Sequence, residues 1–178
     1  MPAVDLNCDL GEGFDDASLL PLVTSANVAC GAHAGDAATM VETCRAAVAA
    51  GVTIGAHPSY PDRANFGRVH VELDPAALRA TLIEQVAALR RAADVAGAEV
   101  RYLKPHGALY NRIAQDAAEA AVVAAVAAEL GLPLLGPSGS AIAAAALAHG
   151  VPFFAEAFAD RAYLSDGALA PAERPVPS

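Results

Sequence analysis

The sequence predicts a parallel α/β fold, and three observations support this prediction. Six short apolar runs are separated by stretches with helical periodicity. Most of these runs lack strict alternation of polar and apolar residues, which is typical of parallel strands covered on both faces. A glycine that ends a helical stretch directly precedes three of the runs, at Gly51, Gly131 and Gly150. Such a chain forms either a barrel or an open doubly wound sheet.

The six apolar runs are the predicted strands. They are Val4–Cys8, Asn27–Cys30, Val52–Ala56, Glu99–Leu103, Leu132–Gly136 and Val151–Ala155. Six βα units are too few to close an eight-stranded barrel, so we expect an open, crescent-shaped sheet. Its uncovered end should expose apolar surface near Phe153, Phe154 and the helix between Ser138 and His149. Residues 1–160 are expected to form one domain, and residues 161–178 an irregular Pro-rich tail.

Helices are predicted between the strands. Asp36 and Asp74 are suitable N-caps, and Pro75 suits the first turn of a helix that Gly97 ends. The predicted helices are a short one over Asp16–Thr24, then Asp36–Ala50, 74–96, 107–130 and 139–149.

Composition and charge exclude several classes of protein. Hydrophobic residues make up 55% of the 178 residues and charged residues 17%, which is typical of a globular chain. The net charge is −9 and no Lys/Arg stripe is present, so neither nucleic acid nor an anionic membrane is an expected partner. The longest apolar run, Ala120–Ala128, is too short to span a bilayer.

Cysteine usage indicates the compartment. Cys8, Cys30 and Cys44 are odd in number and form no C-x-x-C pair, which favours reduced thiols over a disulfide framework. The N-terminus shows no basic region followed by an apolar stretch, so no signal peptide is predicted. We therefore expect a cytoplasmic protein.

Charged side chains follow each of the first four predicted strands. The carboxyl ends of parallel strands share one face, so these side chains should converge there. Three of the five histidines are among them, which favours a functional site over isolated structural histidines. The expected rim residues are Asp9, Glu12, His33, Asp36, His57, Lys104 and His106. Glu156, Asp160 and Arg161 follow the sixth predicted strand and are expected on the same face.

Two chemistries fit this rim. Asp9, His33 and His57 form a ligand set suited to a divalent metal such as zinc. Alternatively, Lys104 holds a phosphate or a developing oxyanion while His106, Glu12 or Asp9 moves protons. Asp36 is more readily explained as a helix cap. Candidates for substrate binding are Asn7, Asp36, Arg63, Arg68, Asp160 and Arg161.

Long motifs in this order resemble those of the LamB/YcsF family. They read D-L-N-C-D-L-G-E-G, S-A-N-V-A-C-G-A-H-A-G-D, G-A-H-P-S-Y-P-D-R-x-x-F-G-R, K-P-H-G-A-L-Y-N and F-A-D-R-A-Y. The resemblance extends to about Pro171. It implies a TIM-like, irregular β/α barrel related to the glycoside hydrolase/deacetylase barrels. Members continue for roughly another third of this length, so we expect the last βα units to be absent from this chain.

The resemblance also implies a function. Family members are identified as the A subunit of a bacterial 5-oxoprolinase, which opens 5-oxo-L-proline to L-glutamate with ATP and Mg²⁺ and acts with subunits B and C. The alternatives are a metal-dependent deacetylase or amidohydrolase on a related barrel, and an inactive protein that only binds its partners. An additional divalent metal and a homo-oligomer are compatible with each. The matching motif positions are Asp9, Glu12, His33, His57, Lys104 and His106.

Overall fold

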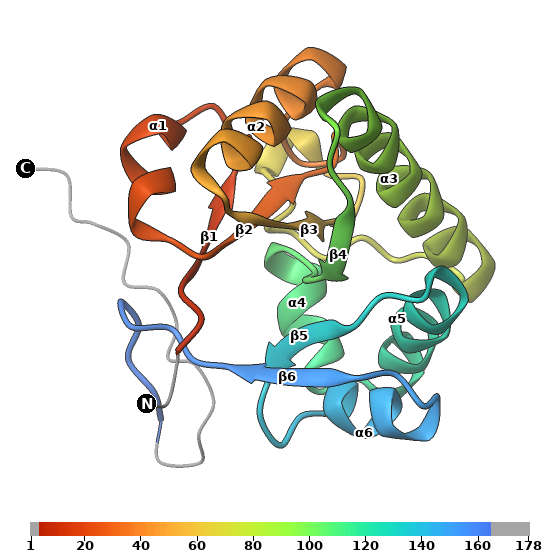
Figure 1. The fold of residues 1–178 in the computed structure, drawn as a ribbon. Helices are drawn as coiled ribbons and strands as arrows, with labels where there is room; N and C mark the ends of the chain where they lie inside the picture. The colour runs from red at the N-terminus through yellow and green to blue at the C-terminus, as the bar shows by residue number, and fades with distance from the viewer. Residues whose placement is uncertain (1–3, 165–178) are drawn as a thin grey trace, which may run out of the picture.

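A single parallel sheet, curled into a half-barrel, forms the centre of the molecule (Figure 1). The computed structural model describes residues 4–164. All neighbouring strands pair in parallel, and the strands follow one another in sequence order across the sheet. They are β1 (Asn7–Leu10), β2 (Ser25–Ala29), β3 (Thr53–His57), β4 (Val100–Leu103), β5 (Leu134–Pro137) and β6 (Phe153–Glu156).

Helices cover the convex side of this sheet. Figure 1 shows α2, α3, α5 and α6 as an outer layer around the curved strands. The predicted α/β class is therefore confirmed. The strands follow one another in sequence order and the helices lie outside them, which is the arrangement of a partial barrel rather than of a doubly wound sheet. The helices are α1 (Asp16–Leu19), α2 (Ala37–Ala50), α3 (Pro75–Ala96), α4 (Gly107–Ile113), α5 (Ala117–Leu130) and α6 (Ala141–Ala148), with 3₁₀ turns η1 (Leu20–Leu22) and η2 (Arg63–Asn65).

The first strand begins three residues later than predicted. Val4 and Leu6 are 86% and 52% exposed, so the first apolar residues of the predicted strand Val4–Cys8 do not point into the core. Leu6 instead bonds to Thr24: its N–H donates to Thr24 Oγ1, and its carbonyl accepts from the Thr24 N–H. The other five strands begin and end within two residues of their predicted bounds.

The helix predicted over residues 107–130 is two helices. α4 ends at Ile113, and α5 begins at Ala117. The Asp116 carboxylate accepts hydrogen bonds from the N–H groups of Ala118 and Glu119 at 2.9 and 3.0 Å. An aspartate that caps the next helix in this way competes with helical hydrogen bonding at its own position, so the helix restarts there.

The two faces of the sheet differ in polarity. On the convex face, aliphatic side chains such as Val28, Ile54 and Leu103 are buried against the helices. On the concave face, the ring of Tyr102 lies across Gly55, where a Cβ atom would be only 2.1 Å from the ring. The Tyr102 hydroxyl donates to Asn27 Oδ1 at 2.7 Å. The concave face therefore holds a buried polar layer, which the site extends.

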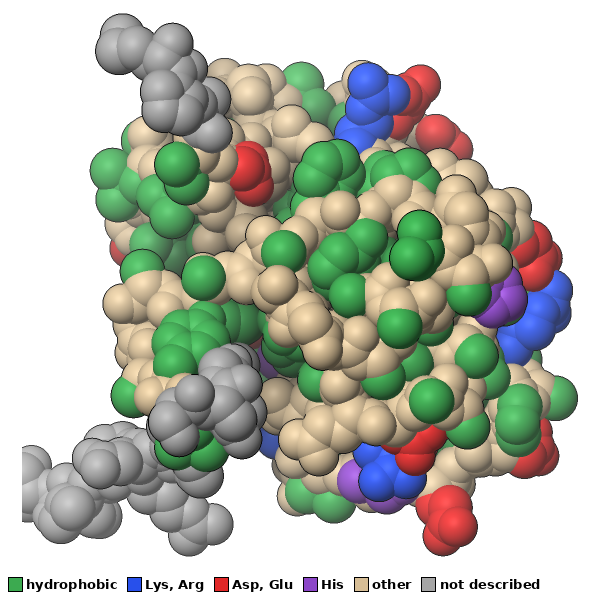
Figure 2. All heavy atoms as spheres, turned by 90° about the horizontal axis from the view of Figure 1, so that it is seen from below, with side chains coloured by type: hydrophobic (Ala, Val, Ile, Leu, Met, Phe, Trp, Pro, Cys, Tyr) green, Lys and Arg blue, Asp and Glu red, His purple; other side chains and the backbone are tan. Residues whose placement is uncertain are grey.

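Apolar side chains are exposed near β6 and α6, as the open sheet predicted. Phe154 on β6 is 59% exposed and Leu147 on α6 is 83% exposed, whereas Phe153 is half-buried. Figure 2 shows hydrophobic side chains scattered over the face that carries these two elements. The Pro-rich tail predicted over residues 161–178 lies, from residue 165 onward, outside the described residues.

Two further sequence predictions concern thiols and membranes. Cys8, Cys30 and Cys44 are all free. Burial raises the pKa of Cys44 to about 11 and is the main cause that raises the pKa of Cys30 to about 12, so both thiols stay protonated and unreactive at neutral pH. Among residues 4–164, no helix has both the length and the apolar character needed to cross a membrane.

Candidate functional site

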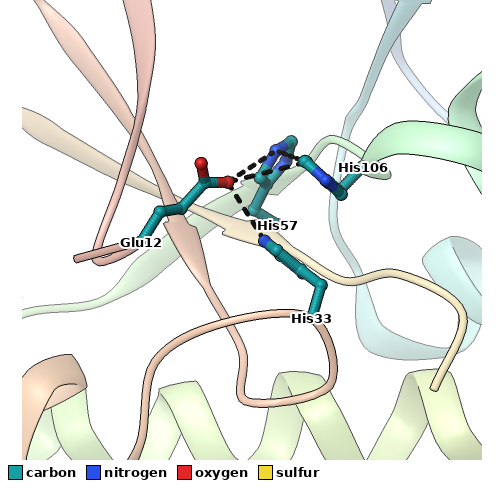
Figure 3. Close-up of side chains that lie close together, drawn as sticks. All are labelled: Glu12, His33, His57 and His106. Atoms are coloured by element: carbon teal, nitrogen blue, oxygen red, sulfur yellow. Dashed lines mark hydrogen bonds and ion pairs between the residues drawn. The ribbon is translucent and has the colours of Figure 1, made fainter. Parts of the chain in front are cut away.

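Three histidines and a glutamate meet at the carboxyl ends of β1 to β4. Figure 3 shows Glu12, His33, His57 and His106 pointing toward one another. One ligand atom from each lies within 4.8 Å of all the others. Glu12 follows β1, His33 follows β2, His57 ends β3 and His106 follows β4. We refer to these four residues as the histidine cluster.

The rings of the histidine cluster are packed closely. His33 and His106 stack with centroids 3.9 Å apart and planes 4° apart, and His57 lies edge-on to both. Burial lowers the pKa of His33, and burial together with the neighbouring imidazoles lowers the pKa of His106 to about 3. Both rings are therefore neutral at physiological pH.

The loop after β3 holds these rings in place. Phe66 has a left-handed backbone conformation, with φ of 58°, that is unusual for a side chain of this kind, and its ring lies edge-on to those of His33 and His106. Gly67, with φ of 66°, follows it. A Cβ at Gly67 would lie 2.9 Å from His33 Cβ and 3.1 Å from His106 Cδ2, so only glycine allows the two histidines this close.

Lys104 forms a second centre beside the histidine cluster. Its buried ammonium lies 3.3 Å from Asp9 Oδ1, 3.3 Å from Glu156 Oε2 and 3.2 Å from Asn7 Oδ1. The same nitrogen lies 5.1 Å from the centroid of the Phe158 ring, a cation–π arrangement. A buried ammonium is costly unless it is paired, and these groups supply the pairing.

Asp9 connects the two centres. Its Oδ1 accepts from Asn27 Nδ2 at 2.8 Å and contacts Lys104, while its Oδ2 lies 3.3 Å from His57 Nε2. Burial alone would raise the pKa of Asp9, but its contacts with His57, Lys104 and Asn27 hold the pKa well below its ordinary value. Its side chain is 35% exposed, so an ionised carboxylate faces the open side of the site.

Two buried polar atoms near Lys104 have no hydrogen-bond partner within residues 4–164. They are the Tyr110 hydroxyl and Glu156 Oε1. Burial and then the charge of Glu156 raise the pKa of Tyr110, so its hydroxyl is a neutral donor. Unsatisfied buried groups beside a cation suit the polar atoms of a bound molecule.

The structure therefore brings together the predicted residues Asn7, Asp9, Glu12, His33, His57, Lys104 and His106. Asp9 lies beside the histidine cluster, while Glu12 and His106 complete the compact group of ligand atoms together with His33 and His57.

The other substrate-binding candidates lie outside this group. Asp36 caps α2, with its Oδ1 accepting from the Thr39 N–H at 2.8 Å. Arg63 donates to the carbonyls of Gly31 and Gly35, which braces the loop that carries His33. The Arg68 guanidinium lies 5.1 Å from the centroid of the Phe66 ring. Exposed Asp160 and half-buried Arg161 follow β6.

The sequence pointed to Glu156 only as a residue on the shared face, with no specific role, and it gave no site role to Asn27 or Tyr110. Asn27 carried a usable signal, since a fully buried asparagine inside an apolar strand needs a polar partner. Glu156 carried a second signal, because a carboxylate at the end of an apolar strand, as at Asp9, needs a polar partner. Tyr110 lies in the K-P-H-G-A-L-Y-N motif on the first turn of a helix, but the motif alone gives it no role that distinguishes it from a core tyrosine.

Comparisons with known proteins agree with the motifs. The LamB/YcsF family model matches residues 4–177. The 5-oxoprolinase A subunit of Streptomyces griseus subsp. griseus is 53% identical, in a match that covers 97% of this chain and 72% of that protein. The 5-oxoprolinase A subunit numbered 3 of Pseudomonas syringae pv. tomato is 49% identical, over 98% of this chain and 72% of that protein.

A solved structure agrees with the fold. The crystal structure of a lactam utilization protein from Thermus thermophilus is similar, with a TM-score of 0.90 and 39% sequence identity. The match covers 95% of this chain and 72% of that chain.

Proposed function

Because this chain belongs to the LamB/YcsF family, we propose that it is the A subunit of a 5-oxoprolinase that opens 5-oxo-L-proline to L-glutamate and consumes ATP with Mg²⁺. The names of the relatives support this proposal. The word "subunit" in those names supports an assembly with further chains, for which we propose subunits B and C. The observation that carries the chemistry is the Lys104 ammonium between the carboxylates of Asp9 and Glu156.

The proposed reaction needs an energy source because a five-membered lactam is a stable amide. Transfer of the terminal phosphoryl group of ATP to the lactam oxygen makes the ring carbon electrophilic. Water then adds to this carbon, and the ring nitrogen leaves with a proton to give an acyl phosphate. A second water hydrolyses the acyl phosphate, so one ATP and two waters yield L-glutamate, ADP and inorganic phosphate.

The side chains around Lys104 match these steps. The ammonium stabilises negative charge on the lactam oxygen and on the phosphoryl group. Asp9 is ionised and partly exposed, so its carboxylate can accept a hydrogen bond from the attacking water and orient it. The Tyr110 hydroxyl and Glu156 Oε1 provide an unused donor and acceptor for the substrate. Glu12 and His106, the other candidates for proton transfer, belong to the histidine cluster.

A second candidate function is metal-dependent hydrolysis of an amide without ATP. The observation that favours it is the histidine cluster, whose imidazoles and carboxylate are common metal ligands. This function requires no phosphorylated intermediate, so dependence on ATP separates the two candidates.

The test is a glutamate-release assay on the chain reconstituted with subunits B and C. We expect glutamate and ADP in equal amounts only when 5-oxoproline, ATP and all three chains are present. Asp9→Asn should lower the rate about 100-fold, since misplacing a reacting group by about 1 Å can cost about 10²-fold. Asp94→Asn, at an exposed aspartate on α3, is the matched control and should leave the rate unchanged.

Two outcomes would overturn the proposal. Amide hydrolysis without ATP would support the second candidate. Stable assembly with B and C that yields no glutamate would leave the chain with a binding role only.

A further inference from the structure

The hydrogen bonds of the histidine cluster fix the protonation of each ring. His57 Nδ1 lies 2.7 Å from the carbonyl oxygen of Lys104, and His106 Nε2 lies 3.0 Å from that of Phe66. A carbonyl oxygen only accepts, so each of these nitrogens carries a hydrogen. In the neutral ring the opposite nitrogen, His57 Nε2 or His106 Nδ1, therefore presents a lone pair.

The same reasoning applies to His33. Its Nδ1 lies 3.0 Å from Ser59 Oγ, and that hydroxyl donates its one hydrogen to the carbonyl of Tyr60 at 2.8 Å. Ser59 Oγ therefore accepts from His33 Nδ1–H. His33 Nε2 is left with a lone pair directed at the cluster.

Four acceptor atoms consequently face one another. Glu12 Oε1 lies 3.1 Å from His33 Nε2, 3.6 Å from His106 Nδ1 and 3.9 Å from His57 Nε2. His57 Nε2 and His106 Nδ1 are 2.9 Å apart. While the three rings are neutral, no hydrogen lies between these atoms, so they repel, and their burial prevents water from relieving the repulsion.

An added proton relieves only part of this repulsion. It bridges one pair of acceptors and leaves the others opposed, and burial disfavours a second charged ring beside the first. A single divalent cation at the centre is attracted to all four acceptors at once.

We propose that Glu12, His33, His57 and His106 bind one divalent transition-metal ion, with zinc as the reference ion. Three neutral imidazoles and one carboxylate form a four-ligand set that suits zinc and related ions. Each imidazole already donates its outer N–H to a carbonyl or hydroxyl oxygen, which is the support that metal-binding histidines need. A metal at this site is compatible with both candidate reactions, so the test below measures metal binding rather than activity.

Metal content of the wild-type chain is the first test. The chain is purified without a polyhistidine tag, stripped with a chelator and titrated with Co²⁺, whose visible absorption reports its coordination. We expect one equivalent to bind with a spectrum of nitrogen and oxygen ligands, and elemental analysis of unstripped protein to find about one metal per chain. Wild-type protein that binds no Co²⁺ or Zn²⁺ above the level of buffer would overturn the proposal without reference to any variant.

Variants then test the ligand set. His33→Ala and Glu12→Gln should each weaken metal binding at least tenfold and abolish the rise in melting temperature that metal gives to the wild type. His149→Ala is the matched control, because this exposed histidine at the end of α6 lies outside the cluster, and it should bind as wild type does. Unchanged affinity in both cluster variants, with circular dichroism showing a native fold, would contradict the assignment.

Discussion

Lys104 shows how one buried charge serves the fold and the site together. Its neighbours Asp9 and Glu156 come from β1 and from the end of β6, so the ammonium joins the two edge strands of the described sheet. A paired buried charge adds little net stability, but removal of one partner leaves the others uncompensated. The sequence placed Lys104 at a strand end, and the structure adds that it spans the open side of the half-barrel.

Lys104→Met is predicted to lower the free energy of unfolding by about 2–3 kcal/mol, because Asp9 and Glu156 lose their counter-charge. The figure is at the low end for a buried pair because the Asp9 side chain is 35% exposed. Addition of Glu156→Gln should restore part of the loss. Urea denaturation measures both effects.

The control for this prediction is Arg101→Met on the same strand. Arg101 and its partner Glu99 have side chains 65% and 76% exposed, so its removal should change stability by at most about 0.5 kcal/mol. Equal losses for the two variants would contradict the pairing role of Lys104.

The members of the site were largely predictable residue by residue, but their partners were not. A charged residue at the end of a buried strand is visible in the sequence, which is why Asp9, His57 and Lys104 could be selected. The oxygen that orients His106 belongs to Phe66, forty positions earlier in the chain. Such a contact depends on the path of the loop after β3, and no local pattern encodes it.

At the scale of elements, the βα joints were predictable and the interior of the longest helical stretch was not. Gly51, Gly97 and Gly131 each adopt the left-handed conformation expected of a helix-ending glycine. Between α4 and α5 no glycine or proline marks the break. Apolar periodicity and alanine content continue through it, so the sequence predicts a single helix across the short polar segment before Ala117.

Asp116→Ala is predicted to lower the melting temperature by about 2–4 °C, because α5 loses its N-cap. Asp116→Asn is the matched control: it keeps the capping oxygen but removes the charge that contacts Arg112 at 2.6 Å. We expect the asparagine variant to melt near the wild type in a calorimetric scan. If both variants lose the same amount, the ion pair rather than the cap accounts for the effect.

At the scale of the whole molecule, the curled sheet gives the protein a polar concave side and two strand edges. Within residues 4–164, β1 and β6 each pair on one side only. A barrel closed on itself has no such edges. The sequence predicted this openness from the number of βα units. The sheet curves away from the face on which the helices pack (Figure 1). The sequence does not show directly which face that is.

Self-association through the β6 edge is the expected consequence. Phe154 and Leu147 place exposed apolar surface beside an unpaired strand, a combination that favours contact between copies of the chain. Light scattering across a concentration series should show the apparent mass rising. Phe154→Lys with Leu147→Lys should hold the mass near that of a monomer, whereas Val95→Lys, at a valine 62% exposed on α3, should not. A wild-type chain that stays monomeric and binds no dye for apolar surface would mean that the β6 edge is covered in solution, and the open half-barrel would not describe the free protein.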